Sequence, residues 1–270
     1  MIAAQRQREI LNEIVKEGSV RVAELATRLD VTEETIRRDL DKLEETGKIR
    51  RSHGGAVLAD QGPQESPHWA REQVNRAEKN AIAQAAADRV QPGDTIILDA
   101  SSTAYYLAAH LPDIPVTVIT NSSKVAIALA DQDQVKVICI GGTLSPKSLS
   151  FVGPVAERNL NEFSADKAFL SCGGVDNQLG LSDANELQAE LRRLMIERSD
   201  HHTLMCDYSK FGSRTLAHIA DIDSFNEVIT DNAIDETFRK KLSECVDTLT
   251  IVDVGAASVE SGSEERAAHG

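Results

Sequence analysis

The chain has 270 residues, is 41% hydrophobic and carries a net charge of -14 at pH 7. This length fits two domains, and no apolar run is long enough to cross a bilayer, which argues against a membrane protein. The four cysteines, Cys139, Cys172, Cys206 and Cys245, lack both metal-ligand spacing and the density of a disulfide framework. We therefore expect buried, reduced thiols, no metal and no cofactor. Because the polar N-terminus predicts no signal peptide, we also expect a cytoplasmic location.

The acidic charge is confined to one part of the chain. Residues 1–58 contain eleven Lys and Arg against eleven Asp and Glu, so residues 59–270 carry the whole net charge. A neutral N-terminal segment can still bind DNA through a local basic face, with an affinity that falls steeply as salt rises. The acidic remainder would discourage non-specific binding to nucleic acid.

The N-terminal segment predicts three helices and a hairpin. Apolar residues recur at helical spacing in 5–16 and 20–29, and a turn leads into a third helix that begins after Thr32, a suitable N-cap. On that helix Arg38 lies opposite the apolar stripe, and a basic hairpin with a Gly-Gly reversal follows. An amphipathic surface helix with solvated charges would explain the third helix alone, but the two preceding helices favour a winged helix-turn-helix.

Three segments of this region, RQREILNEIV, VAELATRLDV and TIRRDLDKLEETGKIRRSHGGA, resemble the DeoR family of bacterial sugar-metabolism regulators. The resemblance covers residues 1–252 and implies a helix-turn-helix at 20–39 that binds operator double-stranded DNA. Matched residue by residue, the predicted DNA contacts are Thr35, Arg37 and Arg38 on the recognition helix and Arg51 and His53 on the wing.

Composition divides the rest of the chain. A polar stretch with glycine and prolines predicts a linker at 59–73 between a DNA-binding domain at 1–58 and a second domain at 74–255. The single tryptophan, Trp69, is expected to pack at this junction. Residues 256–270 are poor in apolar side chains and predict a disordered tail.

The second domain alternates strands with helices. Predicted strands are 95–98, 116–120, 135–140, 167–171, 203–206, 228–229 and 249–252, and predicted helices are 74–90, 102–111, 122–130, 155–163, 185–198 and 235–244. This rhythm is typical of a mainly parallel sheet covered by helices on both faces. The fold class predicted for the chain is therefore a two-domain α/β protein, with a small winged helix-turn-helix and a larger, mainly parallel α/β domain.

Small polar residues and glycines follow the predicted strands, where ligands bind such sheets. Hydroxyl groups and free N–H groups at helix starts suit a phosphate, glycine lets a ligand approach the backbone, and a lysine supplies a cation. Each motif alone is typical of a cap or a turn, but all of them fall at one end of the sheet. The motifs DASST, TNS, GG, CGG and DYSKFG also resemble the DeoR sensor domain.

That resemblance implies a fold similar to ribose-5-phosphate isomerase and CoA transferases, and a phosphorylated sugar or related effector. The predicted ligand-binding residues are Asp99, Ser101, Ser102, Thr103, Asn121, Ser122, Gly141, Gly142, Gly173, Gly174, Glu186, Asp207 and Lys210.

Two functions are compatible with the sequence. The first is a repressor of carbohydrate catabolism genes that a phosphosugar releases from DNA, acting as a homodimer or homotetramer because paired modules read paired half-sites. The second is a phosphosugar isomerase-like enzyme with a DNA-binding appendage, in which Asp99, Glu186, Asp207 and Lys210 transfer protons. The specificity of the N-terminal motif favours the regulator and predicts that the protein is not an enzyme.

Overall fold

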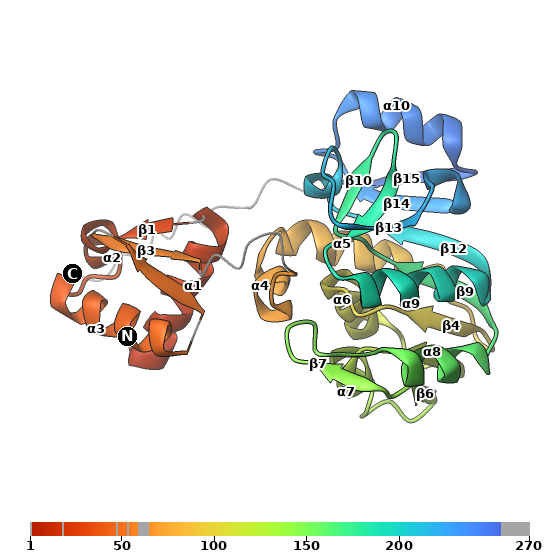
Figure 1. The fold of residues 1–270 in the computed structure, drawn as a ribbon, viewed down its shortest axis with the longest axis horizontal. Helices are drawn as coiled ribbons and strands as arrows, with labels where there is room; N and C mark the ends of the chain where they lie inside the picture. Colours follow the sequence, from red (N-terminus) through yellow and green to blue (C-terminus); the bar gives the residue numbers. More distant parts are fainter. Residues whose placement is uncertain (1, 18, 47, 53, 59–64, 255–270) are drawn as a thin grey trace, which may run out of the picture.

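The computed structural model describes residues 2–17, 19–46, 48–52, 54–58 and 65–254. His53 and the predicted tail 256–270 lie outside the described residues. Figure 1 shows an N-terminal module on the left and a larger α/β domain on the right, with the short helix α4 between them. Across the described ranges, no helix is long and apolar enough to span a membrane.

The N-terminal module is a winged helix-turn-helix, as predicted. Its elements are α1 (Ala3–Glu17), β1 (Ser19–Arg21), α2 (Val22–Arg28), α3 (Glu33–Glu45), β2 (Ile49–Ser52) and β3 (Gly55–Leu58). The three strands form an antiparallel sheet in the order β1-β3-β2. Thr32 caps α3 by accepting a hydrogen bond from the Thr35 N–H. Strand β1 was not predicted, because three residues are too few to show a period.

One apolar core holds the module together. Ile10 of α1, Leu25 of α2, and Ile36 and Leu40 of α3 are fully buried in it. A buried carboxylate also joins two helices, because Asp39 of α3 pairs with the Arg6 guanidinium and accepts a hydrogen bond from Gln7 at 2.9 Å, both from α1. Breaking a buried pair is costly, so this contact fixes α1 against the predicted recognition helix.

Two helices connect the module to the sheet. They are α4 (His68–Gln73), which lies within the range predicted as linker, and α5 (Arg76–Ala87). The helix predicted at 74–90 starts later because Asn75 adopts a left-handed conformation, φ +51°, between them. Trp69 of α4 packs against the core of the module, with Lys48 Nζ 5.4 Å from its ring centroid, which confirms the prediction of junction packing.

Seven strands form the central sheet, and every pairing in it is parallel. In spatial order they are β15 (Thr248–Val252), β14 (Glu227–Asp231), β12 (Ser199–Met205), β9 (Ala165–Leu170), β4 (Thr95–Leu98), β5 (Val116–Thr120) and β6 (Val135–Cys139). This arrangement confirms the predicted fold class. The chain runs from β4 outward to one edge, then returns to β9 and runs to the other edge, so β4 and β9 flank a topological switch point.

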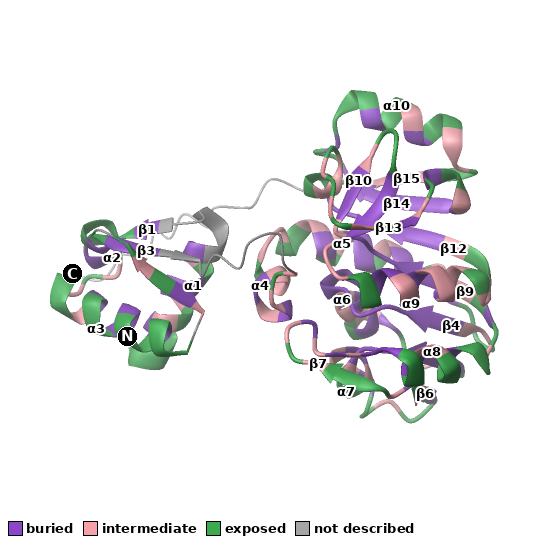
Figure 2. Cartoon of the chain, viewed as in Figure 1, coloured by how far each residue is buried: buried purple, intermediate pink, exposed green. Residues whose placement is uncertain are grey.

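Helices cover both faces of the sheet, and buried residues concentrate in its strands (Figure 2). Alternation along β4 directs Ile96 and Leu98 to one core and Ile97 to the other. The first core contains residues of α5, α6 (Ser102–His110) and α7 (Ser123–Ala128). The second contains residues of α8 (Pro154–Asn161), α9 (Glu186–Glu197) and α10 (Glu236–Cys245).

Short antiparallel strands lie outside this sheet and were not predicted, because none exceeds four residues. They are the hairpin β7 (Thr143–Ser145) and β8 (Ser150–Val152), and the sheet of β10 (Gly174–Asp176), β11 (Gly180–Asp183) and β13 (Ala217–Ala220). Two single-turn 3₁₀ helices, η1 (Tyr208–Lys210) and η2 (Ile222–Ser224), complete the described elements.

Two of the four cysteines depart from the expectation of buried thiols. All four thiols are free, Cys172 and Cys206 are buried, and Cys245 is half-buried. Cys139 is exposed, so the expectation of a buried thiol there was wrong. The reason is that β6 is an edge strand, and its last residue lacks the cover that central strands receive.

Candidate functional site

The predicted recognition helix α3 presents two arginines to solvent. The side chain of Arg37 is 48% exposed and that of Arg38 is 74% exposed, while the preceding Ile36 is fully buried. Both guanidinium groups pair with acids one turn earlier: Arg37 with Glu33 at 2.5 Å and Arg38 with Glu34 at 3.4 Å. These exposed pairs are weak, so phosphates or base edges can compete for the arginines.

The other predicted DNA contacts are placed differently. Thr35 is half-buried, and its hydroxyl oxygen lies 2.9 Å from that of Thr32 at the helix start. Arg51 of β2 donates from Nη1 to the Arg37 carbonyl at 3.1 Å and to Asp41 Oδ1 at 2.8 Å. Its guanidinium therefore ties the wing to α3, and a DNA contact by Arg51 stays a prediction.

A cavity of about 320 Å³ opens at the carboxyl ends of β4 and β9. Residues 101–103, which follow β4, and residues 171–173, which follow β9, form part of its wall. The remaining lining residues are Glu65, Ser66, Arg71, Lys79, Asp183, Ala184, Arg192, Lys210, Arg214, Thr215 and Leu216. The cavity thus occupies the switch point, where ligands bind open α/β sheets.

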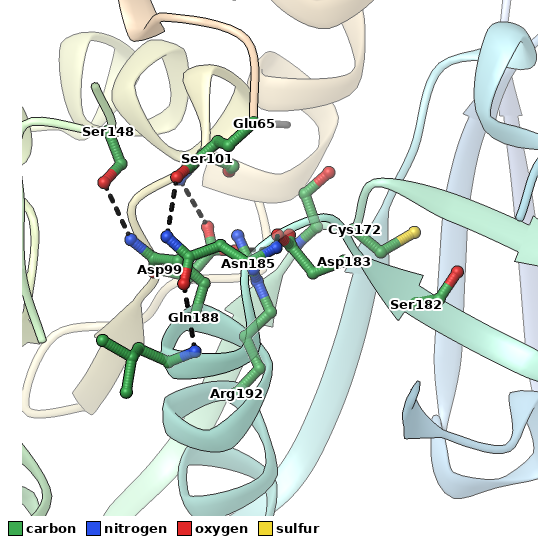
Figure 3. Close-up of polar contacts among 12 residues, drawn as sticks. Glu65, Asp99, Ser101, Ser148, Cys172, Ser182, Asp183, Asn185, Gln188 and Arg192 are labelled. Carbon is green, nitrogen blue, oxygen red and sulfur yellow. Dashed lines mark hydrogen bonds and ion pairs between the residues drawn. The ribbon is translucent and has the colours of Figure 1, made fainter. Parts of the chain in front are cut away.

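Asp99 organises the loops around this cavity without lining it. Its Oδ1 accepts from the Ser101 N–H and its Oδ2 from the Ser171 N–H, both at 3.1 Å, so one carboxylate links the ends of β4 and β9. Arg192 Nε donates to the same Oδ2 at 2.7 Å, and Arg192 Nη1 donates to Asp183 Oδ2 at 2.7 Å. Figure 3 shows the Arg192 side chain projecting from α9 toward Asp99 and Asp183.

Arg192 remains a cation despite its position. Burial alone would lower its pKa, but Asp99 and Asp183 together raise that pKa above its ordinary value. All three side chains are at least nine-tenths buried. A buried arginine between two carboxylates is stable only with this close geometry, so the triad fixes the shape of the site.

A second buried network lies on the α5 side. Asp207 Oδ1 accepts a hydrogen bond from Asn75 Nδ2 at 2.7 Å, and its Oδ2 lies 3.9 Å from Lys79 Nζ. Burial alone would raise the pKa of Asp207, but the charges of Lys210 and Lys79 lower it below its usual value. Lys79 also donates to the carbonyls of Arg71 and Val74. Burial lowers the pKa of Lys79 to about 8, although the negative charge of Asp207 acts to raise it.

Arg71 of α4 brings a further cation to the cavity wall. Its Nη2 lies 3.6 Å from Glu65 Oε1, yet Nε and Nη2 are closed to solvent and have no hydrogen-bond partner. Burial lowers the pKa of Arg71, and Glu65 opposes that effect. Buried guanidinium donors without an acceptor are costly, and an anion in the cavity would satisfy them.

Cationic side chains outnumber carboxylates among the residues that line the cavity. Five cationic side chains line it against two carboxylates, Glu65 and Asp183. Three further carboxylates, Asp99, Asp207 and Asp176, lie outside the lining and pair with Arg192, Lys79 and Arg214. Arg71 differs from these cations because its Nε and Nη2 are buried without an acceptor, which suits an anion in the cavity.

The structure brings together seven of the predicted ligand residues. Ser101, Ser102, Thr103, Gly173 and Lys210 line the cavity, and Asp99 and Asp207 hold its cations in place. Ser101 is also the N-cap of α6, which directs the first N–H groups of that helix toward the loop after β4.

The other six predicted ligand residues lie outside the cavity wall. They are Asn121, Ser122, Gly141, Gly142, Gly174 and Glu186. Ser122 caps α7, and the Asn121 side chain donates to the Phe151 carbonyl at 3.2 Å. A Cβ on Gly174 would meet the Ser213 carbonyl oxygen at 2.5 Å, so that glycine permits close packing of two segments. Glu186 lines a neighbouring cavity of about 470 Å³.

Sequence reasoning missed Glu65, Arg71, Lys79, Asp183 and Arg192. A signal for two of them was present, because Lys79 precedes the buried Ile82 and Ala83 at helical spacing, and Arg192 precedes the buried Met195. A charged residue on the apolar stripe of a helix predicts a buried partner elsewhere in the fold.

Two families match this chain. The family described as the DeoR-like helix-turn-helix domain matches residues 6–62, and the DeoR C terminal sensor domain matches residues 74–232. The chain is 50% identical to an uncharacterized HTH-type transcriptional regulator, YulB, of Bacillus subtilis, over 90% of this chain and 95% of that protein. It is 38% identical to the L-fucose operon activator of Haemophilus influenzae, over 87% of this chain and 94% of that protein.

Matches among solved structures include ribose 5-phosphate isomerase A from Methanocaldococcus jannaschii. The match has a TM-score of 0.39 and 17% identity, and it covers 51% of this chain and 55% of that one.

Proposed function

Because the chain belongs to the DeoR family of transcriptional regulators, we propose that it represses carbohydrate catabolism genes and leaves its operator when a phosphorylated sugar occupies the cavity. The N-terminal module supplies DNA binding and the α/β domain supplies the sensor. Both activities take place in the cytoplasm, the compartment that holds bacterial DNA.

The observation that carries this proposal is the cationic cavity at the switch point. A phosphate monoester carries nearly two negative charges at pH 7 and three acceptor oxygens. Arg71 offers buried donors without acceptors, and Lys79 and Lys210 add positive charge to the same wall. The hydroxyl-bearing residues 101–103 complete a lining suited to a phosphate and sugar hydroxyl groups.

The same geometry supports a phosphosugar isomerase less well than it supports a phosphosugar sensor. The isomerase alternative assigns proton transfer to Asp99, Glu186 or Asp207, and such a carboxylate must be free to reach the substrate. Asp99 is occupied by two N–H groups and Arg192, and Asp207 by Asn75 and Ser209. Glu186 faces a different cavity. We therefore assign Asp99 and Asp207 to holding the site rather than to proton transfer.

Coupling between the two ligands is reciprocal. A phosphosugar that weakens operator binding is itself bound more weakly by the operator complex, by the same factor. We propose that two or four copies act together, because paired recognition helices read half-sites one helical turn or a multiple of that apart. Operator binding would then depend on protomer concentration.

Fluorescence anisotropy with DNA upstream of the protein's own gene and of neighbouring sugar-catabolic genes tests this function. We expect salt-sensitive, specific binding that one member of a phosphosugar panel releases. Lys210→Ala should retain operator binding and lose the response, whereas Lys240→Ala, on the exposed side of α10, should behave as wild type. Specific binding that no phosphosugar alters would contradict the sensor role, and turnover of any phosphosugar would favour the isomerase.

The sign of regulation is measured separately. A relative is named an activator, so a promoter–reporter fusion should be compared in strains with and without this gene. Repression predicts higher reporter output in the strain that lacks the gene, and lower output there would establish activation instead.

A further inference from the structure

Glu65 lies where the chain enters the sensor domain, directly after residues 59–64, which join it to the DNA-binding module. Its side chain is only 10% exposed and forms part of the cavity wall. Oε2 accepts a hydrogen bond from Asn185 Nδ2 at 2.9 Å (Figure 3). Oε1 lies 3.6 Å from Arg71 Nη2. A carboxylate from the entry segment thus already sits among the cavity's cations.

The Glu65–Arg71 contact is incomplete. At 3.6 Å it is an ion pair without a hydrogen bond, and both Arg71 Nε and Nη2 have no acceptor. A guanidinium binds carboxylate or phosphate best through two parallel hydrogen bonds. A phosphate group can provide both acceptors, and its two negative charges would repel the Glu65 carboxylate.

We propose that Glu65 is an internal competitor for the anion site, and that a bound phosphate group expels it and so transmits binding through α4 to the DNA-binding module. This inference rests on the proposed function, because it requires an anion in the same cavity. Beyond the proposed function, it names Glu65 as the residue that responds when an anion occupies the cavity.

The route to the DNA-binding module is short. Arg71 and Trp69 lie on the same helix, α4, two positions apart. Trp69 packs against the core of the module and lies under Lys48, three residues before Arg51 of the wing. Expulsion of Glu65 therefore changes the partner of Arg71 on α4, the helix whose Trp69 contacts the module.

Isothermal titration of the full chain with inorganic phosphate, at constant ionic strength balanced with chloride, tests the competition. Glu65→Gln preserves shape and removes the charge, and we expect it to bind phosphate about tenfold more tightly than wild type, the equivalent of one lost charged contact. Glu190→Gln is the control, because it removes an exposed carboxylate of α9 that pairs with Arg193 and does not line the cavity.

Trp69 supplies an independent readout, since it is the only tryptophan of the chain. Phosphate should shift the tryptophan emission of wild type and of Glu190→Gln. The emission of Glu65→Gln without phosphate should already resemble that of phosphate-bound wild type, and phosphate should change it little.

The outcomes separate this inference from the proposed function. Equal phosphate affinity in wild type, Glu65→Gln and Glu190→Gln would overturn the role of Glu65 and leave the anion site standing. Tighter binding by Glu65→Gln together with emission that phosphate never changes would overturn the transmission through α4. Phosphate binding by none of the three proteins would overturn the anion site, and the inference with it.

Discussion

The DNA-binding module and the sensor domain hold their functional charges in opposite ways. Arg37 and Arg38 are largely exposed, and each pairs with an acid four positions earlier on the same helix. Arg192 of the sensor domain is 3% exposed, and its partner Asp99 is 93 positions away. The first arrangement leaves arginines free to exchange partners with DNA, whereas the second builds a rigid frame around a cavity.

Exposed and buried ion pairs also differ in how much the loss of one partner costs in stability. Exposed pairs contribute little because water and salt screen them, so exchanging one of their partners is easy. Removal of one member of a buried pair leaves an uncompensated charge in a region of low dielectric. Substitution of a buried arginine in the sensor domain should therefore greatly lower stability. Substitution of an exposed arginine on the recognition helix should weaken DNA binding without loss of stability.

The largest effect is expected at Arg192. Arg192→Met leaves Asp99 and Asp183 buried without their cation, and should lower the free energy of unfolding by about 3–5 kcal/mol. Arg193→Met, at the neighbouring position, loses a half-exposed pair with Glu190 and a hydrogen bond to the His218 carbonyl, and should cost about 1–2 kcal/mol. Urea unfolding of the two variants measures both values. Equal losses would show that burial does not distinguish these two arginines.

On the recognition helix, Arg38→Ala should weaken specific operator binding by about 1–3 kcal/mol, because an arginine that pairs with a guanine supplies that much discrimination. Its free energy of unfolding should stay near that of wild type, since the side chain is 74% exposed. Anisotropy and urea unfolding check the two expectations, with Arg239→Ala on α10 as the charge-matched control. If the DNA-binding module of Arg38→Ala were unfolded, Arg38 would have a structural role instead.

A pH series gives a smaller effect in the sensor domain. Lys79 has a pKa of about 8 because it is buried, and it lies near Asp207, Lys210, Arg71 and Glu78. A bound anion favours protonated Lys79 and raises that pKa, so phosphate binding should weaken as pH rises above about 8, by roughly tenfold up to pH 9.5.

Lys79→Met provides the control for that series. It should bind phosphate more weakly at pH 7.5 and show a flat profile across the same interval, measured by isothermal titration. A slope that persists in Lys79→Met would assign the titration to another group.

The smallest expected effect is on α3. Glu34 lies 3.4 Å from Arg38 and 3.9 Å from Arg37, all on the exposed surface. Glu34→Gln should change the free energy of unfolding by no more than about 0.5 kcal/mol. It should strengthen operator binding severalfold, because it removes a charge that repels phosphate and frees Arg38, while Arg37 keeps its closer pair with Glu33. Weaker operator binding by this variant would mean that Glu34 positions the arginines for DNA.

The same contrast explains what the sequence could predict. The winged module follows from local patterns: the apolar spacing of three helices, the cap at Thr32 and the Gly-Gly turn. Strand runs such as 95–98 and 116–120 match β4 and β5 residue for residue, because apolar β-branched runs between turns are distinctive. Three-residue strands such as β1 and β10 carry no period, so only pairing with distant segments defines them.

The residues of the candidate site also fall into those that local sequence patterns predicted and those that they did not. Ser101 to Thr103 were predicted because polar residues after a strand mark the ligand-binding edge of a parallel sheet. Arg71 and Glu65 escaped prediction because they belong to a helix and an entry segment outside that sheet, in a range that composition assigns to a linker. Gly141 and Gly142 fitted the strand-end rule, but β6 is an edge strand, two positions away from the switch point.

The strand order also has a consequence for synthesis on the ribosome. Strands β4, β5 and β6 are neighbours in both sequence and space, so they can pair as soon as they emerge. The central partner of β4 is β9, which begins only at Ala165. At about 5–20 residues per second, one side of β4 therefore waits roughly 3–13 s for its partner. During that interval the nascent chain carries an open β-edge in what becomes the centre of the sheet, which makes this the stage most exposed to aggregation and to chaperone binding.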